Sequence, residues 1–355
     1  MNTKFGFVIS AAPPSESVRW GLLAEKLGFD SVWLPDHFVD LDGARVDPWT
    51  VLAGIGAQTK RILLSTAVTD AYRCHPTKTA HIVASLDELS GGRAQLGIGA
   101  GEMMNLTPFG FVWEKPKERV ERLREAIKVI RLLWASSEKN RVTFKGKYYH
   151  LEEAWLNQGP QKDHIPKIYV GTMSYSKESL MMKVAGELGD GWFPYIHAPE
   201  TYKKGLAVFK EIASESGRKT KELDSAVWIF VALSDDPQVL EAAINSGKVM
   251  LFGSRNVIED MGYKMPRLYD FPNFQNLVVS QKMKDLVTEG CQMIPEEAVR
   301  KCIAIGDSND CIELIDKFVK VGATHIIFRD LTLKVDSTLK QLKEKVIPYF
   351  RGSNF

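Results

Sequence analysis

The sequence is poor in the residues and spacings that mark metal sites, disulfide frameworks and redox thiols. Its 355 residues include only four cysteines, and their spacing matches no zinc or redox motif. They are Cys74, Cys291, Cys302 and Cys311. The seven histidines are scattered, without an HxxxH or HxH pair. We therefore expect reduced structural thiols and no bound metal.

An excess of one charge and a long apolar run are also missing. Lysine and arginine number 46 and aspartate and glutamate 44, so the net charge is +2, with both signs interspersed. This balance gives no basic surface of the kind that binds nucleic acid. No apolar run approaches the roughly 20 residues that span a bilayer, and the opening MNTKFGFVIS lacks a signal-peptide layout. We expect a soluble, cytoplasmic protein that binds a small-molecule substrate and neither nucleic acid nor a membrane.

The hydrophobic residues, 45% of the chain, follow a repeated pattern in which a short apolar segment precedes an amphipathic helical one. Eight segments are predicted strands: 4–10, 31–35, 61–69, 94–100, 167–172, 191–195, 225–233 and 325–330. The predicted helices after them are 16–28, 47–59, 77–90, 116–134, 176–189, 199–217, 237–247 and 336–350. Most strands are continuously apolar, which is typical of parallel strands covered on both faces. Eight such units predict an α/β fold of the (β/α)₈ (TIM) barrel type rather than an open sheet.

Two stretches do not fit this alternation, and we interpret both as insertions at the C-terminal face of the barrel. Residues 141–166 resemble a hairpin that turns at Gly146, followed by a loop. Residues 250–290 are too long for one loop, and their composition suggests a helical insertion over the barrel mouth. No Pro/Ser/Gly-rich linker divides the chain, so residues 1–355 are predicted to form one domain.

Polar residues follow several predicted strands at the end where the chemistry of a barrel gathers. They are Asp36, His37, Thr69, Asp70, Gly99, Gly101, Glu102, Asn105, Gly171, Thr172, Arg329 and Asp330. A histidine and a carboxylate on one rim can act as a general acid/base pair, which makes His37 and Glu102 the candidate catalytic residues. Two plainer interpretations stay open: His37 as a histidine bonded to its own loop, and Glu102 as a helix-start carboxylate. Asp36 is better suited to capping or orienting than to catalysis.

The stretch GIGAGE, residues 97–102, is not a dinucleotide-binding fingerprint, because Glu102 stands where that motif needs its third glycine. Two roles remain for these glycines. They let the backbone turn tightly, or they let a flat ring lie against the backbone while Glu102 points inward.

Four stretches together resemble the bacterial-luciferase-like flavin and deazaflavin oxidoreductases: GFDSVWLPDHF (28–38), LDELSGGRAQLGIGAGE (86–102), AGELGDGWFP (185–194) and GATHIIFRDL (322–331). The resemblance runs nearly end to end and is greatest to the branch that depends on coenzyme F420. It implies a hydride-transferring enzyme with F420 as cofactor, FMN being the alternative, and commonly a homodimer.

The resemblance also implies roles for individual residues. His37 donates or relays a proton, Glu102 is the second acid/base group, and Asp36 contacts the cofactor. Residues 65–68 match a family bulge with a non-proline cis peptide, for which Ala67–Val68 is the candidate bond. The cofactor phosphate is expected at residues 171–179. The further cofactor-binding positions expected are Ala67, Val68, Asp70, Ala100, Gly101, Asn105, Gly171, Thr172, Ser176 and Lys177.

The substrate is less determined. Leu41 stands near the position where sugar-phosphate relatives carry an indole, so a sugar phosphate is disfavoured. Resemblance to the phthiodiolone-type ketoreductases favours a carbonyl or secondary alcohol; the alternatives are a methylenetetrahydromethanopterin reductase and an FMN-dependent monooxygenase. A non-catalytic barrel is a third class. Five side chains are candidates for an apolar substrate wall, or for ordinary packing: Met103, Met104, Phe109, Phe111 and Trp113.

Overall fold

The computed structural model describes residues 3–10, 12–40, 46–161, 164–265 and 274–352. Eight predicted strands are present and pair in parallel. They are β1 (Lys4–Val8), β2 (Ser31–Leu34), β3 (Leu63–Thr66) with its continuation β4 (Thr69–Asp70), β5 (Leu96–Gly99), β8 (Ile168–Thr172), β9 (Gly191–Pro194), β10 (Ala226–Leu233) and β12 (His325–Asp330). One sheet runs β10-β12-β1-β2-β3 and the other β4-β5-β8-β9.

Two isolated bridges join these sheets into a ring. Leu64 of β3 pairs with Ala94, just before β5, and Gly191 of β9 pairs with Asp224, just before β10. The parallel sheet thus curls around as a (β/α)₈ barrel does, and the predicted fold class is confirmed.

The helices that follow these strands match the predictions closely. They are α1 (Pro14–Lys26), α2 (Pro48–Gly56), α3 (Pro76–Ser90), α5 (Pro116–Trp134), α6 (Leu180–Leu188), α7 (Pro199–Glu215) and α8 (Pro237–Phe252), with α13 (Val335–Gln341), the π-turn Leu342–Val346 and α14 (Ile347–Arg351) at the end. Six of them begin at a proline, whose fixed φ suits the first helical position and whose missing N–H is not needed there. The prediction for α6 began too early: the helix begins at Leu180, and Ser179 caps it by accepting from Met182 N.

One further unit was missed by the sequence analysis. After α11 (Glu296–Cys302), the three-residue strand β11 (Ala304–Gly306) pairs with the last residues of β10 and leads into α12 (Ser308–Lys320). Such a short strand directly after a helix offers too few residues for a periodicity signal. The ring does not depend on it, because β12 pairs with β10 over six residues.

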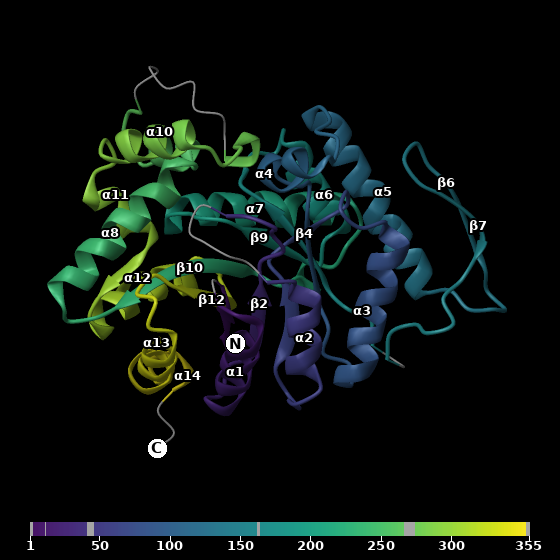
Figure 1. The fold of residues 1–355 in the computed structure, drawn as a ribbon, viewed down its shortest axis with the longest axis horizontal. Coiled ribbons are helices and arrows are strands. Elements are labelled where there is room, and N and C mark those ends of the chain that lie inside the picture. The colour runs from purple at the N-terminus through teal and green to yellow at the C-terminus, as the bar shows by residue number, and fades with distance from the viewer. Residues whose placement is uncertain (1–2, 11, 41–45, 162–163, 266–273, 353–355) are drawn as a thin grey trace.

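The expected hairpin and helical segments are present, but the hairpin lies in the connection from α5 to β8, which enters β8 at its amino end, and so it does not belong to a loop at the C-terminal face. The hairpin of β6 (Val142–Lys145) and β7 (His150–Ala154) is antiparallel, turns at Gly146 and stands out from the body (Figure 1). The second insertion is helical where the structure describes it, with α9 (Arg255–Asp260), a 3₁₀ turn at Phe274–Asn276 and α10 (Gln281–Cys291). Short helical segments also occur at α4 (Met103–Leu106), Thr107–Phe109 and Thr220–Glu222.

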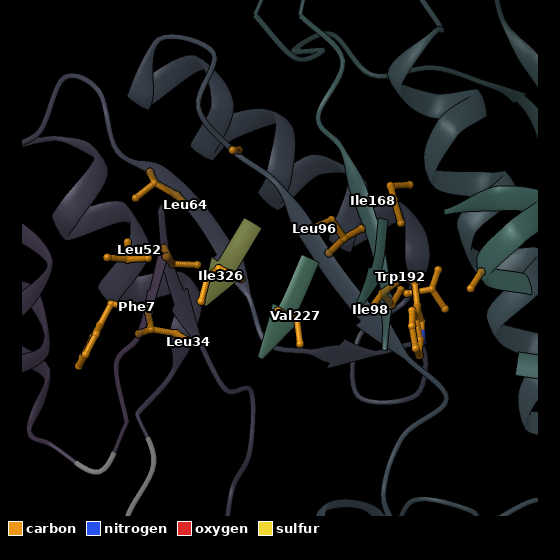
Figure 2. Close-up of a cluster of buried hydrophobic side chains, with 14 of the residues drawn as sticks. Phe7, Leu34, Leu52, Leu64, Leu96, Ile98, Ile168, Trp192, Val227 and Ile326 are labelled. Carbon is orange, nitrogen blue, oxygen red and sulfur yellow. The ribbon is translucent and has the colours of Figure 1, made fainter. Parts of the chain in front are cut away.

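The strands are buried on both faces, as their apolar composition predicts. Along β10 all eight residues are buried and alternate between two clusters. One cluster, drawn in Figure 2, includes Val227, Ile326 and Leu96 and packs between the strands and the outer helices. The other includes Trp228, Phe230 and Trp33 and fills the barrel interior below the site.

A buried arginine ties the start of β3 to two helix ends. The guanidinium of Arg93, 6% exposed, donates to the carbonyls of Gly56, Thr59, Ile62 and Ser90 and to the Thr59 hydroxyl. These bonds satisfy carbonyls that the ends of α2 and α3 leave open.

Replacing Arg93 with methionine keeps most of the apolar volume but leaves several buried carbonyls without donors. We expect the free energy of unfolding to fall by about 3 kcal/mol or more, measured by urea denaturation. The exposed Arg61, which makes one bond to Glu25 O, is the control, and Arg61→Met is expected to cost less than about 1 kcal/mol. Equal midpoints for the two variants would contradict this role of Arg93.

Candidate active site

An open cavity lies at the carboxyl ends of the strands, with an empty volume of about 1040 Å³, mouth included. This is the size and place expected of a ligand site in a barrel. Eleven predicted site residues line it: Asp36, His37, Ala67, Val68, Asp70, Ala100, Gly101, Glu102, Asn105, Gly171 and Thr172. Gln275 of the second insertion and Met250 near the end of α8 also line it, which places that insertion at the mouth.

His37 and Glu102 meet in this cavity from neighbouring regions of the rim. Pro35 ends β2 and His37 follows, while Glu102 comes three residues after β5. His37 Nε2 lies 3.3 Å from Glu102 Oε2, and His37 Nδ1 lies 2.9 Å from Asp40 Oδ2. With Asp40 accepting the Nδ1 proton, Nε2 is directed at Glu102. Asp40, which the sequence analysis did not single out, thus orients the imidazole.

Both plainer interpretations can be judged from the geometry. Glu102 does stand at the N-cap of α4, but its side chain makes no capping bond to that four-residue helix. It lies beside His37 instead. The bond from His37 to Asp40 is within its own loop, as the plainer interpretation of His37 expects, yet it uses only one ring nitrogen.

The electrostatics of Glu102 suit a group that exchanges a proton. Burial raises the pKa of the Glu102 carboxyl above its usual range, and Asp40 and Asp70 add to this, while His37 and Arg73 oppose it. A carboxyl with a raised pKa beside an imidazole is a common arrangement in acid/base catalysis.

Asp36 is tied into the rim rather than directed at a reacting group. Its carboxylate accepts from the Thr69 hydroxyl at 2.5 Å and from Arg73 Nη1 at 3.1 Å. Burial raises the pKa of Asp36, and Arg73 opposes this. Arg73 also lines the cavity and was missed, although its place in the loop after β4 is the signal that could have found it.

Asn105 holds the loop that carries His37. Its Oδ1 accepts from the backbone N–H groups of Phe38 (2.7 Å) and Val39 (3.0 Å). Its Nδ2 is buried and has no hydrogen-bond partner within the described residues. An acceptor on a ligand in the cavity would satisfy this donor.

The expected cis peptide at Ala67–Val68 is present. The glycines opposite this peptide pack against Val68, whereas the sequence analysis offered contact with a flat ring as one of their roles. A Cβ atom at Gly99 would lie 3.0 Å from Val68 Cγ2, and one at Gly171 would lie 3.1 Å from the same methyl. These glycines therefore make room for Val68. Gly101, at φ +80°, fits the tight-turn interpretation.

Two predicted phosphate-binding residues do not line the cavity. Lys177 Nζ lies 2.6 Å from carboxylate oxygens of both Glu211 and Glu215 on α7, and the Ser176 hydroxyl donates to Glu178. A second hollow shares Thr172, Met173 and Gln275 with the cavity. Its polar lining includes Ser174, Ser179, Ser254 and Arg255.

Of the two interpretations of the five apolar candidates, the structure favours ordinary packing over a substrate wall. None of the residues 103, 104, 109, 111 and 113 is among those that line the cavity. The guanidinium carbon of Arg119 lies 3.6 Å from the ring centroid of Trp113, and Phe109 packs on Phe38. The apolar lining comes instead from other strands and from α8: Met173, Phe193, Tyr195, Trp228 and Met250.

Three other predictions concern absent features or undescribed residues. No group of three or more His, Cys, Asp or Glu side chains that could hold a metal ion occurs among the residues that the structure describes. None of the described helices is both long and apolar enough to cross a membrane. Leu41 lies outside the described residues.

Comparison with known proteins agrees with this geometry. Residues 2–325 match the family described as luciferase-like monooxygenase, and the chain belongs to that family. It is 31% identical over 360 residues to an F420-dependent glucose-6-phosphate dehydrogenase of Beutenbergia cavernae, covering 98% of both chains. It is 26% identical over 376 residues to a phthiodiolone/phenolphthiodiolone dimycocerosates ketoreductase of Mycobacterium bovis, covering 98% of this chain and 96% of that one.

The fold is similar to that of a solved F420-dependent secondary alcohol dehydrogenase in complex with an F420-acetone adduct. The TM-score is 0.82 at 25% identity, covering 99% of this chain and 100% of the other.

The raised pKa of Glu102 has a consequence for stability. When a carboxyl has a higher pKa in the folded than in the unfolded protein, the free energy of unfolding falls as the pH rises through the folded pKa, because the buried group must then ionise. We therefore expect Glu102→Gln to melt higher than wild type at pH 7.5, by about 1–4 °C, and the difference to vanish near pH 4. Melting curves from pH 4 to 8 measure this, with Glu88→Gln on an exposed position of α3 as control. A lower melting temperature for Glu102→Gln at pH 7.5 would refute it.

Proposed function

We propose that this protein is a coenzyme F420-dependent oxidoreductase that transfers a hydride between the deazaflavin and a carbonyl or secondary alcohol. The observation that carries the proposal is the pairing of His37 with Glu102, at 3.3 Å, in the cavity at the barrel mouth. The names of the relatives identify the cofactor on which they depend.

The residues present fit such a cofactor. The Ala67–Val68 bulge and the segments around Gly101 and Gly171 would bear on its ring, and Asn105 Nδ2 is a buried donor without a described partner. The hollow beside the cavity offers serine hydroxyls and Arg255 to an acidic tail. Arg255, rather than Lys177, is the cation at this end, because Arg255 lines the hollow while Lys177 does not; Arg255 also bonds to Glu259, as Lys177 does to Glu211 and Glu215.

The chain's own part in the reaction is to move one proton and exclude water. Coenzyme F420, when bound, supplies the hydride chemistry. Either His37 Nε2 or Glu102 takes the one hydroxyl proton of an alcohol, and in the reverse direction the same group returns it to the carbonyl oxygen. Asp40 keeps the imidazole directed at Glu102. The aromatic and methionine side chains of the wall keep water away from the reacting carbon.

The lining favours a neutral carbonyl or alcohol over a sugar phosphate. No lysine is among the described residues that line the cavity. Of the arginines, Arg73 is held by Asp36 and Asp70, and Arg329 lies over the rings of Trp228 and Phe230. A methylene-pterin substrate and an FMN-dependent monooxygenase are the alternatives. We further propose a homodimer, as the family resemblance implies, and a location in the cytoplasm, as the sequence pattern indicates.

Cofactor choice is the first test. Titration followed by F420 fluorescence is expected to show saturable binding, with FMN bound at least about 10-fold more weakly, because an acidic tail reaches Arg255 and the neighbouring hydroxyls. Tight binding of FMN alone would favour a monooxygenase, and binding of neither would favour a non-catalytic barrel. Turnover is then screened with secondary alcohols, ketones, methylene-pterins and glucose 6-phosphate.

The catalytic pair gives a second test. His37→Ala and Glu102→Gln are each expected to lower kcat by about 10²–10⁴-fold, because each removes a proton-transfer group. F420 affinity should change little. The matched controls are His81→Ala and Glu88→Gln, both at exposed positions of α3. The assignment is wrong if either catalytic variant, shown by fluorescence to bind F420, keeps near wild-type turnover.

A further inference from the structure

The guanidinium of Arg73 lies among three carboxylates at one rim of the barrel. Its Nε donates to Asp70 Oδ2, its Nη1 to Asp36 Oδ1 and its Nη2 to the backbone carbonyl of Asp36. The third carboxylate, Glu102, interacts with Arg73 electrostatically across the same cavity. The Arg73 side chain is only 9% exposed, and Phe38 lies over its guanidinium.

The loop that carries Arg73 is itself fixed. Asp70 Oδ1 accepts the backbone N–H groups of Tyr72 and Arg73 at 2.8 and 2.9 Å. The Tyr149 hydroxyl of the hairpin donates to the carbonyl of Ala71 at 2.8 Å. The position of the guanidinium is therefore set by the surrounding backbone, and the carboxylates bond to a preorganised group.

We propose that Arg73 is a positioning residue for proton transfer: it holds the residue immediately before His37 by both its carboxylate and its carbonyl, and it places a fixed positive charge in the cavity that Glu102 also lines. Through Asp36 it sets where His37 stands relative to Glu102. This inference rests on the proposed function, since the proton transfer it serves is that of the hydride-transfer reaction.

The charges around Glu102 show why this cation is needed. The groups that face it are His37 and Asp40 after β2, Asp70 at the end of β4 and Arg73 in the loop after β4. Tyr195 after β9 and Arg329 of β12 line the same cavity. Burial and two carboxylates disfavour the charged form of Glu102, and Arg73 and His37 favour it. Removing Arg73 takes away the positive charge that offsets the negative charges of Asp36, Asp70 and Glu102.

The test separates charge from geometry with two substitutions. In Arg73→Met, the limb of the kcat/KM pH profile that belongs to Glu102 should move to higher pH by about one unit or more. Its kcat should fall about 10-fold or more, because His37 is no longer held in place. In Arg73→Lys the charge is retained, so the limb should return towards wild type. Its kcat should stay low, because an ammonium cannot bond to Asp70 and to both Asp36 oxygens in one planar fork.

A readout without turnover accompanies the kinetics. Carboxyl ¹³C NMR of the cofactor-free protein, with the Glu102 signal identified by its loss in Glu102→Gln, follows the titration of Glu102 directly. Its midpoint should rise in Arg73→Met. The matched control is Arg119→Met, because Arg119 is also buried, stacks on Trp113 and is not among the cavity-lining residues. Melting curves confirm that each variant is folded.

The outcomes are distinguishable. An unmoved Glu102 titration and pH limb in folded Arg73→Met would overturn the inference, as would an equal shift in Arg119→Met. If Arg73→Met does not fold, Arg73→Lys decides alone. A wild-type kcat in Arg73→Lys overturns the inference. A low kcat, with the Glu102 limb of the pH profile at its wild-type position, supports it. If the NMR midpoint rises but the wild-type protein never turns over with F420, the proposed function fails while the electrostatic role of Arg73 stands.

Discussion

Parallel pairing of β1 with both β2 and β12 is the constraint on which the rest of the structure depends. It brings the first and last strands of the chain side by side and lets the sheet curl around. All carboxyl ends then lie at one rim, so residues that are far apart in sequence, such as His37 and Glu102, share a single cavity. Apolar strands such as β10 stabilise this arrangement with both faces, one packed against the outer helices and the other inside the barrel.

Most of the fold could be predicted from the sequence, because each strand–helix unit repeats the same local pattern. Continuous apolar runs such as AVWIFVAL (226–233) predict a strand buried on both faces, and β10 is one. β11 could not be predicted in this way, since three residues carry no period and its identity as a strand comes from pairing with the end of β10. Tertiary contact, rather than local preference, decides such segments.

The site was predictable where chemistry follows directly from strand ends, and less so where it depends on loops. His37, Glu102 and the Ala67–Val68 bond lie where expected. Arg73 and Asp40 lie within four residues of predicted positions, but only the folded loops turn them towards Asp36 and His37. Lys177 illustrates the opposite case: nothing in its own segment reveals that Glu211 and Glu215 on α7 bind it.

Asn105 stands three residues after Glu102 in the same short helical segment, and its carboxamide holds the backbone directly after His37. The two candidate acid/base groups are thus linked through one turn of chain as well as through the barrel. A shift of α4 would carry Glu102 and the His37 loop together, so their separation is protected from movements that alter the mouth of the cavity. Changes at Gln275 of the second insertion or at Met250 of α8 would therefore reshape the mouth of the cavity without separating Glu102 from His37.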